Sequence, residues 1–419
     1  MKTRPALAIV PALAAAACAQ TPPAPATPPV DWRALEAPVL THHTQLTSRD
    51  QFLRAGEAYF GQGDWIIFQA VPTPEHGKAP DPFYSMYVAK LTHDKDGRIS
   101  GTERTERISP PGSYNTCGWF HPQLPGTVMF ASTLDAPTTE QPGGFNVKGR
   151  TYTWMFPKET EIVTVGVRDI FTDVVAKNPA HAPKGQAEPK VLFSRPDYDA
   201  ECSFSKDGRF VLYAHVREDH KPGERADADI WIYDTETKQQ HAIVAADGYD
   251  GGPFFSPDGK RICYRSDRKK NDLLQLFIAD LKFENGVPVG ISREYQLTDN
   301  EAVNWAPFWH PSGKFLVYGT SEIGHDNYEV FAIEIDDAKL AADGKGSRAA
   351  DTLRHQRITY APGADLLPAF SADGKTLMWT GQRGPIVAGE QKPSSQMWVA
   401  DFDARGLFGS EQRKANSEH

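Results

Sequence analysis

Four stretches of the chain repeat one pattern of apolar and polar positions. Each has an apolar pair, a tight turn that ends in glycine, and then a strand in which apolar residues alternate or run on. The copies are SFSKDGRFVLYAHV from Ser203, PFFSPDGKRICYRS from Pro253, PFWHPSGKFLVYGT from Pro307 and PAFSADGKTLMWTG from Pro368. Asp-Gly and Ser-Gly supply the positive φ that a short hairpin needs, so each copy predicts two antiparallel strands.

Two degenerate copies, AYFGQGDWIIFQA from Ala58 and GWFHPQLPGTVMFAS from Gly118, bring the number of hairpins to six. A third strand is expected after every hairpin, at SMYVAKL from Ser85, TYTWMF from Thr151, DIWIYDT from Asp229, QLFIADL from Gln275, EVFAIEI from Glu329 and QMWVADF from Gln396. The intervals 132–151 and 173–189 are expected to be insertions within the second repeat. Loops of this kind on a rigid scaffold often carry binding specificity.

A fourth, outer strand is expected after five of the copies. Three share a short pattern, Arg107-Ile108-Ser109, Gln296-Leu297-Thr298 and Arg357-Ile358-Thr359, and VLFS from Val191 and HAIVA from His241 take the same place in two more. The last copy has none, but Gln45-Leu46-Thr47 carries the pattern ahead of the first copy. We therefore expect an all-β fold, a six-bladed β-propeller of four-stranded antiparallel blades over residues 41–403. In it, the N-terminal strand completes the last blade and leaves no sheet edge open.

The runs Phe255–Lys260 and Phe370–Lys375, of the form F-S-x-D-G-K, resemble the WD40-like (PD40) repeat of the TolB family, and the resemblance covers residues 45–403. It implies a periplasm-facing propeller that docks a protein or peptide on one face. Related propellers are fused to serine peptidases, but this sequence has no G-x-S-x-G nucleophile motif. Others are metal-dependent lyases of pectic oligosaccharides. His121, His310 and His325 lie in or near turns without H-x-H or H-x-x-x-H spacing, so a metal site would have to be assembled from several blades.

The first residues have the layout of an export signal. Lys2 and Arg4 precede an apolar stretch and small residues, so residues 1–19 are expected to be a signal peptide. Ala15-Ala16-Ala17-Cys18 resembles a bacterial lipobox, with Cys18 as the acylated residue; ordinary cleavage nearby is the alternative. Residues 20–40 then read as a Pro-rich linker and 404–419 as a polar tail. We expect a protein of the periplasm or an outer-membrane lipoprotein, without a transmembrane helix.

Equivalent positions of the repeats place polar residues around one opening of the central channel. At the start of the innermost strands stand Asn115, Asp199, Asp250, Asn304 and Asp365, and two residues further along stand Glu57 and Glu201 in their own repeats. Such a collar suits a cationic group or a divalent metal. The alternative is that the Asp and Asn side chains hold backbone N–H groups and fix the turn into each blade. Both roles are compatible. The Asp residues of the D-G turns, Asp207, Asp258 and Asp373, are expected to be structural.

Aromatic and basic residues near the same strands are further candidates. Trp119, Trp305 and Trp309 lie close to the innermost strands and are possible recognition aromatics, and Arg268 and Arg383 follow second strands in loops. The formal charge of −9, or −11 once Lys2 and Arg4 are removed, disfavours nucleic acid as a partner. We expect a monomeric, non-catalytic binding protein of the cell envelope with a protein or peptide partner and no cofactor, anchored to the membrane if Cys18 is acylated. The alternatives are a metal-dependent enzyme acting on polysaccharide, and a module that binds a small molecule or metal.

Overall fold

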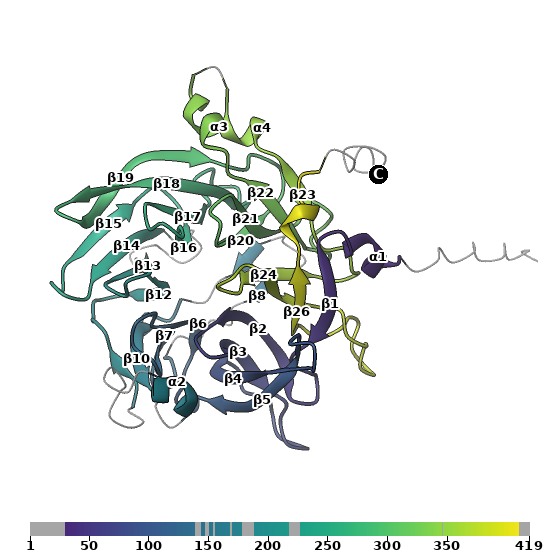
Figure 1. The fold of residues 1–419 in the computed structure, drawn as a ribbon. Coiled ribbons are helices and arrows are strands. Elements are labelled where there is room, and N and C mark those ends of the chain that lie inside the picture. Colours follow the sequence, from purple (N-terminus) through teal and green to yellow (C-terminus); the bar gives the residue numbers. More distant parts are fainter. Residues whose placement is uncertain are drawn as a thin grey trace, which may run out of the picture. The chain divides into compact units, whose positions relative to one another are not determined.

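Six four-stranded antiparallel sheets make up the body of the protein. The computed structural model describes residues 30–138, 144–146, 151–153, 156–167, 170–177, 188–217, 227–345 and 347–409. The innermost strands of successive sheets contact one another, and β24 (Asp365–Phe370) in the last sheet contacts β2 (Phe52–Phe60) in the first. The sheets therefore close into a ring (Figure 1), which confirms the predicted six-bladed β-propeller.

The blades follow the order of the chain from the innermost strand outward. Blade 1 is β2, β3 (Trp65–Pro72), β4 (Ser85–His93) and β5 (Ile99–Arg107). Blade 2 is β6 (Asn115–Phe120), β7 (Thr127–Ser132), β10 (Glu161–Gly166) and β11 (Lys190–Val191). Blade 3 is β12 (Tyr198–Phe204), β13 (Phe210–Val216), β14 (Ala228–Asp234) and β15 (Gln240–Val244).

The second half of the ring repeats this order. Blade 4 is β16 (Asp250–Phe255), β17 (Arg261–Ser266), β18 (Gln275–Glu284) and β19 (Val287–Gln296). Blade 5 is β20 (Asn304–Trp309), β21 (Phe315–Thr320), β22 (Glu329–Glu334) and β23 (His355–Arg357). Blade 6 is β24, β25 (Thr376–Gly381), β26 (Gln396–Phe402) and, as its outer strand, β1 (Leu40–Gln45).

The predicted closure of the last blade is confirmed. Strand β1 pairs antiparallel with β26, with Leu40 opposite Phe402 and Gln45 opposite Trp398. Ahead of it, the short helix α1 (Trp32–Glu36) lies within the segment expected to be a linker, and its Glu36 is 1% exposed. The N-terminal segment therefore supplies both an outer strand and a buried carboxylate to the ring.

The short pattern that suggested the outer strands has a common physical role. The first residue of the pattern is the last residue of the outer strand, and the other two follow it. The apolar residue is buried, and the hydroxyl accepts a hydrogen bond from a backbone N–H of the third strand. These bonds run from Met86 N to Ser109 Oγ, Leu276 N to Thr298 Oγ1, Val330 N to Thr359 Oγ1 and Met397 N to Thr47 Oγ1, at 2.7–3.0 Å. A buried N–H left without an acceptor costs about 1–3 kcal/mol, which explains why a hydroxyl recurs there.

The hydrophobic core is divided among the contacts between blades. One buried cluster lies between blades 1 and 2 around Trp65 and Phe130, and another between blades 5 and 6 around Val317 and Trp379. The other four neighbouring pairs each have their own cluster. Because every blade buries both faces on its neighbours, no blade is stable alone, and the ring positions its inner strands rigidly.

One predicted strand of blade 2 is wrong. The third strand is β10, not the segment from Thr151; Val163 of β10 stands opposite Phe130 of β7. Residues 151–153 instead form β9 (Thr151–Thr153), which pairs with β8 (Gly144–Asn146) in a separate hairpin. The insertion in this blade thus extends to Thr160, and both segments alternate apolar residues, so the local pattern did not distinguish them.

Three short helices, all outside the predicted elements, lie within the blades. Helix α2 (Thr172–Lys177) is in the second insertion of blade 2, and α3 (Asp337–Ala342) and α4 (Ala349–Thr352) connect the last two strands of blade 5. No helix in the described ranges is long and apolar enough to cross a membrane. The predicted signal peptide, Cys18 and the end of the polar tail lie outside the described residues.

Candidate binding site at the channel mouth

The predicted collar of Asp and Asn residues is buried within the blades. All five residues, Asn115, Asp199, Asp250, Asn304 and Asp365, are 0% exposed. Asn115 Nδ2 donates to the carbonyl of Tyr84 at 3.0 Å, and Asp250 accepts from the backbone N–H of Ala246 at 3.0 Å. Of these two, Asp250 holds a backbone N–H group as the structural alternative expected, whereas Asn115 donates to a carbonyl instead. A ligand role for them stays a prediction.

The two predicted loop arginines also bind within the chain. Arg383 donates to both Asp365 and Glu36, with its side chain 1% exposed, so the carboxylate that it caps belongs to helix α1. Arg268 donates to Glu294 at 2.6 Å and to Asp250 at 3.3 Å. As loop residues, the two arginines were candidates for binding a ligand carboxylate. Both guanidinium groups instead bind carboxylates of the chain itself.

A ring of β-bulges lines the channel just beyond the collar. In every blade the pairing between the first and second strands slips by one residue, and the residue at the slip has a positive φ of 48–61°. We call these residues the bulge ring: Glu57, Cys117, Glu201, Gly252, Ala306 and Leu367. Positive φ strains a residue that has a Cβ, and five of the six positions accept that strain. Glu57 and Glu201, predicted to face the channel by strand alternation, are placed there by the bulge instead.

Glu57 is a carboxylate without a cationic partner. Cys117 Sγ donates to Glu57 Oε1 at 3.0 Å, and the Thr116 hydroxyl lies 3.5 Å from Oε2. Among the residues that the structure describes, no Lys, Arg or His lies within 4.0 Å of this carboxylate. Burial raises the pKa of Glu57 to about 7, and the negative charge of Glu201 adds to the shift, while Cys117 and the more distant Arg265 oppose it.

Glu201 has the opposite environment, because it is paired with Arg265. Arg265 Nη2 donates to Glu201 Oε1 at 2.9 Å and contacts the Tyr249 hydroxyl at 3.0 Å, and that hydroxyl also donates to Glu201. The backbone N–H of Gly252 donates to Glu201 Oε2 at 2.5 Å. The Glu201 side chain is 13% exposed and the Arg265 side chain 9%. The two residues form a neutral pair beside Glu57.

Two glycines make room for this pair. A Cβ on Gly252 would lie 1.9 Å from Arg265 Nη1, and a Cβ on Gly251 would lie 2.6 Å from Glu201 Oε2. Gly252 also has a φ of 61°, which favours glycine. Blade 4 therefore gives up its side chain in the bulge ring, and the guanidinium of Arg265 occupies that place.

An aromatic plug crosses the channel axis below the bulge ring. Tyr59 lies 5.8 Å from Phe254, and Trp119 lies 6.2 Å from Phe308, measured between ring centroids. The first pair joins blades 1 and 4 and the second joins blades 2 and 5, which are opposite one another, so these contacts are made across the axis. The plug residues follow the bulge by two positions, and so lie about 6 Å deeper in the channel.

The three predicted recognition aromatics have different positions. Trp119 belongs to the plug. Trp305 lies beside the mouth, with its ring 5.6 Å from the Arg265 guanidinium carbon. Trp309 is 5% exposed and packs between blades 4 and 5, where its Nε1 donates to the carbonyl of Phe254 at 3.3 Å. Two of the three therefore line the channel.

Arg265, Tyr249 and the plug residues other than Trp119 were not predicted from the sequence. Arg265 was detectable, because the equivalent positions in the second strands of the other blades are uncharged: Gln69, Ala131, Ala214, Gly319 and Thr380. The adjacent Gly251-Gly252 was the second signal, since all five other repeats have at least one side chain larger than alanine at these positions. An arginine in a buried strand and a glycine pair on the neighbouring strand together indicate that the arginine side chain fills the space left by the missing glycine side chains.

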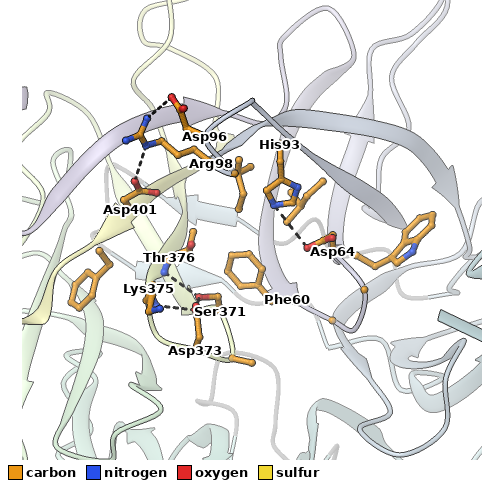
Figure 2. Close-up of a pocket in the computed structure, with 18 of the residues that line it drawn as sticks. Phe60, Asp64, His93, Asp96, Arg98, Ser371, Asp373, Lys375, Thr376 and Asp401 are labelled. Carbon is orange, nitrogen blue, oxygen red and sulfur yellow. Dashed lines mark hydrogen bonds and ion pairs between the residues drawn. The ribbon is translucent and has the colours of Figure 1, made fainter. Parts of the chain in front are cut away.

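A groove of about 900 Å³ lies at the opposite end of the inner strands, between blades 6 and 1. It is lined by the turn after β2 and the D-G turn before β25, on the far side from Glu57. Figure 2 shows Arg98 in this groove reaching both Asp96 and Asp401, at 3.3 and 3.6 Å. A second groove of the same kind lies between blades 3 and 4, which marks both as features of the repeat.

Two of the three histidines considered as metal ligands, His121 and His310, bind backbone groups of turns. His121 Nδ1 accepts from the backbone N–H groups of Gln123 and Leu124, and His310 Nδ1 accepts from that of Ser312, at 3.0–3.1 Å. Burial lowers the pKa of His121 to about 4. In the part of the chain that the structure describes, no group of three or more His, Cys, Asp or Glu residues is arranged to hold a metal ion.

Comparison with known proteins gives short or distant similarities. No protein-family model matches the chain. Over 112 residues it is 34% identical to dipeptidyl-peptidase 5 of Porphyromonas gingivalis, which is 26% of this chain but only 16% of that protein. Among solved structures, TolB from Acinetobacter baumannii has a TM-score of 0.45 at 15% identity, over 77% of this chain and 60% of that chain. An oligogalacturonate lyase in complex with manganese has a TM-score of 0.44 at 12% identity, over 88% of this chain and 97% of that chain.

Proposed function

We propose that this chain is a non-catalytic binding protein that holds a cationic group of a peptide or protein partner in the mouth of its channel. The observation that carries the proposal is Glu57, a half-buried carboxylate that accepts from a thiol and a hydroxyl but is paired with no cation among the described residues. An unpaired buried carboxylate is costly, and a ligand cation removes that cost.

The neighbouring residues favour an organic cation over a metal ion. Beside Glu57 lie a thiol, the Glu201–Arg265 pair and the rings of Tyr249 and Trp305. A hard divalent ion takes six or more oxygen ligands. Among the described residues around Glu57, the one other carboxylate is Glu201, which is already held by Arg265. Aromatic faces and one carboxylate are the surroundings that suit an ammonium or guanidinium group.

Binding is expected to depend on pH through Glu57. The charged and titratable groups around it come from blades 1 to 4. They are Glu201, Arg265, Cys117, Cys202, Tyr59, Tyr84 and Tyr114. Since burial raises the pKa of Glu57 to about 7, the site is mainly neutral at pH 5 and mainly anionic at pH 8. A cation therefore binds up to about 100-fold more weakly at pH 5 than at pH 8, because only the ionised fraction of Glu57 attracts it.

The experiment compares n-butylammonium with n-butanol as probes, titrated into the wild-type protein and into Glu57→Gln. The amide of glutamine keeps the shape and can still accept from Cys117, but it removes the charge. We expect the wild-type protein to bind the ammonium at least tenfold more tightly than the alcohol, and the variant to lose this preference. Glu301→Gln, an exposed substitution between β19 and β20 at the same end of the channel, is the matched control. Equal affinity of wild type and Glu57→Gln for the ammonium would contradict the proposal.

The place of action that we propose is the bacterial cell envelope. The basic, apolar and small-residue order of residues 1–19 and the lipobox-like Ala15–Cys18 support export, with a Pro-rich segment leading to the propeller and a polar tail after it. The mass of the mature N-terminal peptide tests this directly. An acylated Cys18 at the terminus supports the lipoprotein, cleavage without acylation supports a periplasmic protein, and an intact Met1 in exporting cells contradicts both.

A further inference from the structure

A second unsatisfied group lies in the channel mouth. Arg265 Nε–H is buried and has no hydrogen-bond partner among the described residues, although Nη2 of the same guanidinium donates to Glu201 and contacts the Tyr249 hydroxyl. The Arg265 side chain is nine-tenths buried, with 9% exposed. Buried donors are nearly always satisfied in folded proteins, so an orphaned guanidinium N–H in a channel calls for an acceptor oxygen from outside the chain.

This donor and Glu57 belong to one site. Arg265 lowers the pKa of Glu57, and Glu57 raises that of Arg265, so the two charges act on each other across the mouth. Glu57 comes from blade 1 and Arg265 from blade 4, which face each other across the channel. A ligand that enters between them meets the Glu57 carboxylate, which has no cation, on one side. On the other side it meets Arg265 Nε–H, which has no acceptor among the described residues.

The aromatic plug limits how far such a ligand can enter. Tyr59, Trp119, Phe254 and Phe308 meet one another across the axis about two residues deeper than the bulge ring. A chain that threads through the ring would have to displace four packed aromatic side chains. The end of a chain, in contrast, reaches Glu57 and stops above the plug.

We propose that the group held in the mouth is the free N-terminus of a peptide or protein. Its α-ammonium group binds the Glu57 carboxylate, its first carbonyl oxygen accepts from Arg265 Nε–H, and its first side chain packs on Tyr249 and Trp305. This rests on the proposed function, because it assumes that Glu57 binds a cation. A lysine side chain has an ammonium but no oxygen beside it, so it satisfies Glu57 and leaves Arg265 unpaired.

The test uses four probes on the full wild-type protein by isothermal titration. They are Phe-Gly-Gly-amide, its N-acetyl form, N-acetyl-Lys-Gly-Gly-amide and 2-phenylethylamine, with each affinity corrected for the fraction of amine that is protonated. We expect the free peptide to bind at least tenfold more tightly than the other three. The comparison with 2-phenylethylamine isolates the carbonyl contact, because that amine has the same ring and ammonium without the oxygen.

Two results would overturn the inference in different ways. If the lysine probe or 2-phenylethylamine binds as tightly as the free peptide, and Glu57→Gln weakens all of them, the site takes cations in general and the N-terminus is not its ligand. If no probe shows a dependence on Glu57, the proposed function fails as well. Arg265→Lys keeps a cation beside Glu201 but removes Nε–H, and should abolish the preference for the free peptide over 2-phenylethylamine. If that variant does not fold, the affinities of the wild-type protein for Phe-Gly-Gly-amide and 2-phenylethylamine still test the carbonyl contact.

Discussion

Replacing Glu57 with glutamine should stabilise the folded protein, by an amount that grows with pH. Glu57 is half-buried and has no cationic partner among the described residues, and its pKa is raised to about 7 by burial and by Glu201. A carboxyl group with a raised pKa is tolerated in its neutral form and penalised in its charged form. Glutamine resembles the neutral form at every pH, so the difference between the two proteins isolates the charge.

The magnitude follows from the two pKa values. The ordinary value of 4.5 applies to the unfolded chain and about 7 to the folded protein. Below pH 4.5 the group is protonated in both states, and wild type and variant differ little. Between the two values the unfolded chain ionises first, so wild-type stability falls as pH rises, and the loss is complete above pH 7. The separation corresponds to about 3 kcal/mol, since each pKa unit is worth about 1.4 kcal/mol.

Urea unfolding of the two proteins at pH 5 and pH 8 measures this difference. The free energy of unfolding of Glu57→Gln should exceed that of wild type by about 3 kcal/mol at pH 8 and by less than about 1 kcal/mol at pH 5. Glu301→Gln, whose carboxylate is exposed, should show no such change with pH. A stability difference for Glu57→Gln that is the same at both pH values would refute the reasoning that Glu57 is an unpaired buried charge.

Three further substitutions or deletions test the framework around the site. Arg383→Ala leaves two buried carboxylates without their cation and should lower the free energy of unfolding by about 3–5 kcal/mol, whereas Arg405→Ala, with a side chain 91% exposed, should leave it unchanged; urea unfolding of both variants checks this. Deletion through Thr47 removes β1 and exposes the edge of β26, so calorimetry should show a much lower melting temperature; unaltered melting would contradict the closure. Gly251→Ala places a Cβ 2.5 Å from the Tyr249 hydroxyl and should lower the melting temperature by several degrees, while Gly290→Ala, with no atom within 4 Å of the new Cβ, should not.

The sequence was sufficient for features that depend on neighbouring residues. The D-G turns were detectable because the Asp side chain accepts from the preceding Ser hydroxyl and from a backbone N–H within the turn, as Asp258 does from Ser256 and Lys260. The closing strand was detectable because Thr47 repeats the hydroxyl contact that Thr298 makes in its own blade. Both signals recur with the repeat and need no knowledge of the tertiary structure.

Features that depend on the closed ring were not available from the sequence. The third strand of blade 2 was misplaced because two segments with similar alternation follow a long insertion, and only the pairing with β7 distinguishes them. Aligning the repeats predicted that Glu57 and Glu201 face the channel, but it did not predict which side chains they contact there. Arg265 comes from a second strand and Tyr59 meets Phe254 from the opposite blade, and these contacts exist only once the ring is closed.

The number of protons released on binding tests the central claim most directly. If a ligand cation binds to Glu57, it forces that carboxyl group to ionise, and at pH 6.5 roughly three quarters of the Glu57 side chains are protonated beforehand. Titration of n-butylammonium in buffers of different ionisation enthalpy should therefore give more than half a proton released per ligand for the wild-type protein and none for Glu57→Gln. Binding by the wild-type protein without proton release would contradict the account.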